Sequence, residues 1–156
     1  MSNDIFIKID GIEGESKDAK HKNEIDISSW RWGMDQRADM HSGSGGGAGK
    51  ASVTDLRFHH AIDRASPNLM KYCLTGKHID QAVLVMRKAG GNALEHLKIT
   101  MSDVIVSSVT IDGASDSEAV TLSFAKVKQE YMVQNEQGGS GGAVTASFDI
   151  KANKEA

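Results

Sequence analysis

The stretch VTLSFAKVKQEYMV, residues 120–133, decides the fold class. Its apolar side chains first fall on even positions, at Val120, Leu122 and Phe124, which is the two-residue period of a β-strand. They then move to odd positions, beginning with Val127. A strand that changes its buried face needs a bulge or a sharp bend, and long bent strands curl a sheet into a barrel. This stretch therefore predicts a bent strand in a curled sheet.

The same alternation of apolar and polar residues recurs along the chain. Two further stretches change phase midway, meaning that their apolar residues move from odd to even positions, one after Ile27 and one after Met101. Glycine-containing turns such as Asp112–Gly113 separate the short segments. The pattern predicts an antiparallel, mainly β domain whose other strands cover residues 5–9, 25–34, 53–58, 82–86, 97–106 and 144–150.

One short helix is expected to interrupt the strands. Ser66 is a favourable N-cap, Pro67 suits the first helical position, and Gly76 can end the helix in the left-handed conformation. A helix of about ten residues is not stable alone in water, so we expect it to lie against the barrel. Its predicted apolar stripe is Leu69, Met70, Cys73 and Leu74.

Length and composition bound the class of protein. The chain has 156 residues, which suits one domain spanning residues 1–156 with a short charged tail at 151–156. Its net charge of −3 argues against a nucleic-acid-binding surface. No apolar run is long enough to span a membrane, and no N-terminal secretory signal is evident. A single cysteine excludes an internal disulfide, so we expect synthesis in the cytoplasm and export by a signal-independent route.

The glycine-rich run at residues 43–50 superficially resembles a phosphate-binding loop. It departs from that motif because Ser44 stands where the first glycine is needed and Ala51 where a hydroxyl would bind magnesium. The residues that follow alternate like a strand, whereas a phosphate loop opens a helix. We interpret residues 38–50 as an extended loop, either a disordered tip or a loop of the protruding kind that often binds partners.

Catalytic, metal and cofactor sites are not predicted. None of the six histidines has the i, i+4 spacing of a helical metal site, and Cys73 has no second cysteine. The two Gly-Ser-Gly segments lack the strand-to-helix context of a serine nucleophile. We therefore expect a protein without enzymatic activity.

Two tryptophans mark one face of a predicted strand. Trp30 and Trp32 point the same way, and burial is their simplest role because large aromatics remove the most apolar area from water. Arg31 then points the other way, toward solvent, a neighbouring subunit or a cavity. The predicted aromatic core is Trp30, Trp32, Phe58, Phe124 and Phe148.

Several segments, in order, resemble the haemolysin-coregulated protein (Hcp) family. The resemblance covers about residues 4–150 and lies in residues 4–9, 12–18, 24–33, 45–50, 66–69, 87–91, 106–109 and 122–131. It implies a small antiparallel β-barrel of two sheets with one flanking helix, similar to phage tail-tube proteins. It also implies that Arg31, between the tryptophans, faces the lumen of a ring.

The function implied by this resemblance is structural. Six subunits would form a ring, and the rings would stack into the inner tube of a type VI secretion system, under a spike protein and inside a contractile sheath. The tube protein would itself be secreted and carry small effectors, and an Arg31 belt would favour acidic ones. Candidate ring or tube contacts are Met40, His41, Gly46, Gly47 and Lys50.

Three alternatives remain open from the sequence. A phage-type tail-tube protein would share the architecture in a different machine. A ligand-binding barrel, such as a lectin-like module, would need a pocket in or at the mouth of one barrel and no ring. An enzyme is disfavoured by the failed motif tests.

Overall fold

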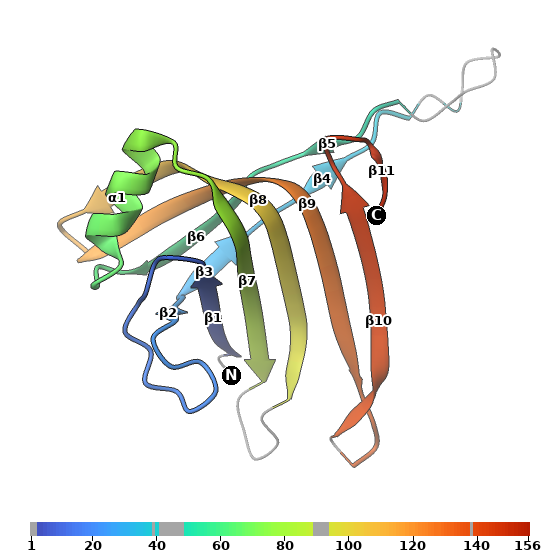
Figure 1. The fold of residues 1–156 in the computed structure, drawn as a ribbon. Coiled ribbons are helices and arrows are strands. Elements are labelled where there is room, and N and C mark those ends of the chain that lie inside the picture. The colour runs from blue at the N-terminus through green and yellow to red at the C-terminus, as the bar shows by residue number, and fades with distance from the viewer. Residues whose placement is uncertain (1–2, 39, 41–48, 89–93, 138) are drawn as a thin grey trace.

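The predicted fold class, mainly β with one short helix, is confirmed (Figure 1). The structure is a computed structural model that describes residues 3–38, 40, 49–88, 94–137 and 139–156. Helix α1, the one helix among these residues, covers Ser66–Thr75. The strands are β1 (Asn3–Ile9), β2 (Ile25–Asp26), β3 (Ser29–Arg31), β4 (Met34–Asp35), β5 (Ser52–Val53), β6 (Leu56–Ala61), β7 (Ile79–Lys88), β8 (Glu95–Asp112), β9 (Ser117–Gln134), β10 (Ser140–Asp149) and β11 (Lys154–Glu155).

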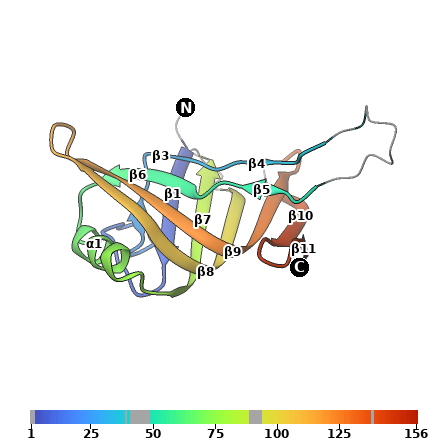
Figure 2. The ribbon, with the colours of Figure 1, turned by 90° about the horizontal axis from the view of Figure 1, so that it is seen from above.

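Nine of these strands form one antiparallel sheet that curls around the core (Figure 2). Its main path runs β11-β10-β9-β8-β7-β1-β2, and a branch adds β6 to β9 and β3 to β6. Strand β9 makes the curl possible because its first part pairs with β6 and its last part with β10. A separate two-stranded sheet, β4–β5, leads away from this body toward the glycine-rich loop.

The curled sheet is completed between β2 and β3 by single backbone hydrogen bonds and not by a continuous ladder of strand pairs. Between β2 and β3, the Ile27 amide donates to Ile5 O at 3.0 Å, and the next amide, that of Ser28, donates to His59 O at 2.9 Å. The chain thus passes from pairing with β1 to pairing with β6. The predicted change of phase after Ile27 lies at this transfer.

The two long strands bend where the sequence changes phase. In β8, burial moves from odd positions such as Met101 to even positions such as Val104, and Asp103 between them has a left-handed φ of 56°. In β9, the buried positions change from Phe124 to Val127. A register shift between Val106 and Ser108 adds a bulge to β8. These bends let each 18-residue strand serve both sides of the curled sheet.

The helix has the predicted extent but differs in two details. Gly76 ends it in the left-handed region, with φ 64° and ψ 30°, as expected. The predicted cap at Ser66 is wrong: Ala65 is the N-cap, and the Ser66 hydroxyl donates to buried Glu118 instead. The predicted stripe is also wrong in part, because Tyr72 is buried with Leu69 while Met70 and Leu74 are 50% and 78% exposed and Cys73 is half-buried.

The aromatic residues assigned to the core differ in depth. Phe58 is fully buried and Phe124 is 9% exposed. Trp30, Trp32 and Phe148 are half-buried and pack against the edge of the core. The centre of the core is aliphatic, and its fully buried members include Ile7, Ile25, Leu56, Leu69, Leu84 and Leu122.

Candidate functional site

A polar face lies on the outer side of β3, β6 and β9, opposite the core. In the strand register Arg31 lies directly opposite Arg57, Arg57 opposite Thr121, and Thr121 opposite Ser108 on β8. The neighbouring positions Trp30, Phe58 and Val120 form the core-facing row. Alternation along each strand therefore points both arginines away from the core.

The two arginines line an open hollow of about 390 Å³. Trp32, Thr54 and Thr121 also line it, and Trp32 Nε1 donates to Thr54 O at 2.9 Å. One carboxylate reaches the margin, Asp55, which accepts a hydrogen bond from Ser107 Oγ at 3.0 Å. Within the described part of the chain, neither guanidinium lies within ion-pair distance of a carboxylate.

An apolar row crosses five strands on the core-facing side and runs beyond the core. Register places Ile5 opposite Met86, Met86 opposite Leu97, Leu97 opposite Tyr131, and Tyr131 opposite Val144. The first three residues are half-buried, whereas Tyr131 is 42% and Val144 64% exposed. The exposed fraction of the side chains in this row therefore increases toward β10.

Strand β10 is itself exposed. Every position from Ser140 to Ala146 is exposed, so neither face of this part of the strand is covered. On its outer edge, β11 pairs only with the last two residues, Phe148 and Asp149. The rest of that edge presents backbone groups that can extend the sheet.

The residues assigned to the glycine-rich loop are only partly described. Met40 is 78% exposed, and Lys50 is exposed beside β5. The Gly49 amide donates to Arg37 O at 3.3 Å, which continues the β4–β5 pairing outward. His41, Gly46 and Gly47 lie outside the described residues. No interface contact of these five residues is tested by the single chain.

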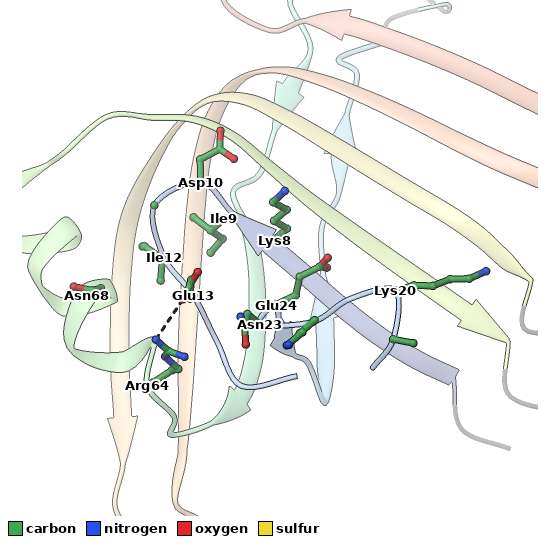
Figure 3. Close-up of a pocket in the computed structure, with 13 residues that line it drawn as sticks. Lys8, Ile9, Asp10, Ile12, Glu13, Lys20, Asn23, Glu24, Arg64 and Asn68 are labelled. Atoms are coloured by element: carbon green, nitrogen blue, oxygen red, sulfur yellow. Dashed lines mark ion pairs between the residues drawn. The ribbon is translucent and has the colours of Figure 1, made fainter. Parts of the chain in front are cut away.

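A hollow of about 940 Å³ lies between residues 8–13, residues 19–24 and the start of α1 (Figure 3). Its charged side chains have both signs, and Arg64 pairs with Glu13 at 3.3 Å with both side chains more than half exposed. Exposed ion pairs of this kind contribute little to the stability of a protein. Its charged residues are Lys8, Asp10, Glu13, Lys20, Lys22, Glu24 and Arg64.

A buried ion pair joins β6, β9 and the start of α1. Glu118 Oε1 accepts from His60 Nε2 at 2.8 Å and from Ser66 Oγ at 3.1 Å, and the His60 and Glu118 side chains are fully buried. His60 Nδ1 lies 3.7 Å from Asp63 Oδ2. Burial alone lowers the pKa of His60, but the carboxylates of Asp63 and Glu118 outweigh it and raise that pKa above 6.5. The arrangement is that of a structural pair enclosed by the fold.

A second cluster fastens the segment after β1 to the sheet. Arg87 donates to Asp18 at 3.0 and 2.7 Å and to Asp4 at 3.0 Å, and its guanidinium lies 5.1 Å from the centre of the Phe6 ring. These hydrogen bonds lower the pKa of Asp18 to about 2. His21 stacks on the same ring at 4.3 Å. This cluster also has a structural role.

No group of three or more potential metal ligands occurs among the residues the structure describes. Over the same residues, no helix is both long and apolar enough to cross a membrane. The geometry therefore points to two surfaces, the arginine-bearing face and the uncovered apolar row.

The comparisons with known proteins identify the family. The family described as "Type VI secretion system effector, Hcp" matches residues 6–131. Protein hcp1 of Pseudomonas aeruginosa is 48% identical over 162 residues, and the match covers all of both chains. The chain belongs to the Hcp family of type VI secretion proteins.

Solved Hcp structures share the fold along the whole chain. Hcp1 of Salmonella typhimurium is 58% identical with a TM-score of 0.82, and the match covers all of both chains. A type VI secretion system effector of Yersinia pestis is 43% identical with a TM-score of 0.78, covering 94% of this chain and all of that one. The family resemblance seen in the sequence is confirmed.

Both candidate surfaces of this Hcp protein contain residues that the sequence did not single out. Alternation around Phe58 places Arg57 outside the core, but only the β3–β6 register places it opposite Arg31. Tyr131 and Val144 read as ordinary strand residues, and their exposure follows from where the sheet ends. Pairing between distant strands is what brings these residues together.

Proposed function

We propose that this Hcp protein is the structural subunit of a type VI secretion inner tube, built from stacked hexameric rings. One observation carries the proposal: the apolar row ending in Tyr131 and Val144 continues past the core without a cover. Uncovered apolar surface rimmed by polar residues is typical of a protein–protein interface. The occupant we assign to it is a second copy of this chain.

A second copy fits because the exposed row and the open β10 edge lie at one side of the molecule. A contact between this side and a different side of the next copy is heterologous, and such contacts build closed rings when the rotation closes. Pairing along a strand edge adds backbone hydrogen bonds to apolar burial. The result is a stiff wall suited to a tube.

In the proposed ring, the outer face of β3, β6 and β9 with Arg31 lines the lumen, where small effectors are carried. The extended loop, through Met40, His41, Gly46, Gly47 and Lys50, contacts a neighbour within or between rings. The role is mechanical and needs no enzymatic activity. It involves a spike protein at the tube tip and a contractile sheath around it.

The proposed route follows from this role. The chain is made in the cytoplasm, loaded into the tube and secreted with it by the type VI machine. Cofactors, nucleic acid and membrane insertion take no part in this route.

Replacing Val144 by aspartate tests the ring. The carboxylate would have to be buried in the interface, so we expect hexamers near six times 16.7 kDa in the parent and smaller species in the variant, measured by light scattering. The matched control is Leu74→Asp on α1, which is 78% exposed and outside the proposed interface.

Circular dichroism separates loss of assembly from loss of folding. Because Val144 is already 64% exposed, we expect the folded signal to persist in both variants. A monomeric parent protein at high concentration, or hexamers of normal size from Val144→Asp, would contradict the proposed interface.

A further inference from the structure

We propose that Arg31 and Arg57 form a paired binding site for carboxylate groups of an acidic polypeptide. The two residues are direct cross-strand partners on β3 and β6, and both side chains lie exposed on the outer face. They line one hollow, together with Trp32, Thr54 and Thr121. The site itself follows from strand register, and that its ligand is carried cargo rests on the proposed function.

The pairing of two arginines has a cost that a ligand would relieve. Like charges directly opposite each other on neighbouring strands destabilise a sheet. Two other arginines of this protein have carboxylate partners: Arg64 pairs with Glu13, and Arg87 pairs with Asp4 and Asp18. Across the described residues, Arg31 and Arg57 have no such partner. An anion between the two guanidiniums would offset their repulsion.

The carboxylate that lines the hollow leaves the site positively charged. Asp55 lines the same hollow but accepts a hydrogen bond from Ser107 Oγ at 3.0 Å. Two guanidiniums and one carboxylate leave a local excess of one positive charge. The chain as a whole has a net charge of −3, so an acidic ligand can be attracted only by a local site of this kind.

The shape and donor set favour carboxylates. Guanidinium groups present planar, paired N–H donors that match the two oxygens of a carboxylate. Thr121 adds a hydroxyl group at the edge of the hollow, whereas the Thr54 hydroxyl already donates to Gly33 O at 3.0 Å. The hollow is open on the face of a sheet, which suits side chains projecting from a polypeptide. In the proposed ring, repetition of the site around the lumen would let one acidic segment engage several copies.

The test measures the binding of a fluorescent oligoglutamate peptide to the full chain by anisotropy. We expect salt-sensitive binding that weakens about fivefold in Arg31→Gln and in Arg57→Gln, and is lost in the double variant. The matched control is Lys71→Gln, which removes one exposed positive charge on α1. Equal weakening in Lys71→Gln, or unchanged binding in Arg57→Gln, would overturn the site.

Two further measurements complete the test. An oligoglutamine peptide should not bind, and inorganic phosphate should bind more weakly than oligoglutamate because it offers one anionic group where the peptide offers several carboxylates. Phosphate binding as tight as the peptide would refute the assignment to polypeptide. Light scattering on the same samples separates the proposals: rings without peptide binding defeat only the site, and binding without rings defeats only the ring.

Discussion

Replacing Glu118 by leucine tests whether the buried His60–Glu118 pair holds β6, β9 and helix α1 together. The carboxylate accepts two hydrogen bonds, from His60 Nε2 at 2.8 Å and Ser66 Oγ at 3.1 Å, and the ion-paired side chains are fully buried. Removing one member of a buried pair leaves the other uncompensated, at a cost of about 3–5 kcal/mol. We expect the free energy of unfolding to fall by that amount in Glu118→Leu or His60→Leu.

The double variant His60→Leu/Glu118→Leu gives the decisive comparison. Replacing both members of a buried pair by apolar side chains of similar volume is often neutral. Here the Ser66 hydroxyl still loses its acceptor, so we expect a total loss of about 1 kcal/mol. The double variant should therefore be more stable than either single variant.

Urea unfolding followed by tryptophan fluorescence measures these differences, because Trp30 and Trp32 pack against the core. All variants are compared at one protein concentration, since assembly adds to apparent stability. If the double variant loses as much as the two single variants combined, the two side chains act independently and the reasoning is refuted.

The same pair predicts that the stability depends on pH above 6.5. His60 has a folded pKa raised above 6.5, so its stabilisation is complete below that value and is lost as pH rises through the folded pKa. The slope is at most about 1.4 kcal/mol per pH unit. As pH rises through the folded pKa of His60, the free energy of unfolding should decline in the parent. The double variant, which lacks His60, should not show this decline. An identical pH profile would contradict the assignment.

Two remaining predictions concern the segment after β1. Gly14→Ala should lower the free energy of unfolding by about 1–3 kcal/mol, because the added Cβ would lie 2.6 Å from Glu24 O. The control is Gly113→Ala, whose Cβ meets open space and should change the free energy of unfolding little. Equal effects of the two variants in urea unfolding would rule out the clash. Asp18 has a pKa lowered from 3.8 to about 2 by Arg87, so its stabilisation is present above pH 3.8 and lost as pH falls toward 2. Acid unfolding of Asp18→Asn should lack that component, and an unchanged acid transition would argue against the pair.

The candidate surfaces show where prediction from the sequence stops. Alternation alone orients Arg31 away from Trp30 and Trp32. It cannot place Arg57 beside Arg31, because 25 residues, including the glycine-rich segment, separate them in the chain and their pairing depends on register. Likewise, it cannot show that the apolar row continues to Val144 beyond the core.

The helix start illustrates the same limit at one residue. Ser66 has the composition of an N-cap, yet its hydroxyl donates to Glu118, which lies 52 residues away on β9. A buried carboxylate needs hydrogen-bond donors, and this need prevails over the local capping preference. The sequence does not indicate that the Ser66 hydroxyl will bind Glu118 in place of capping the helix, because His60 and Glu118 look like ordinary strand residues.

The sequence by itself determined the long strands, their changes of phase, the extent of the helix and the family. These features depend on side-chain periodicity, turn residues and ordered motifs, all of which are local in the chain. The predicted strands at 25–34 and 53–58 were wrong in extent, because the first is divided into β2, β3 and β4 and the second into β5 and β6. Only the tertiary structure decided which side chains face each other across strands, which polar groups are buried together, and which apolar residues are left uncovered. Those outcomes depend on register and on where the curled sheet ends, and both are set by contacts between segments far apart in sequence.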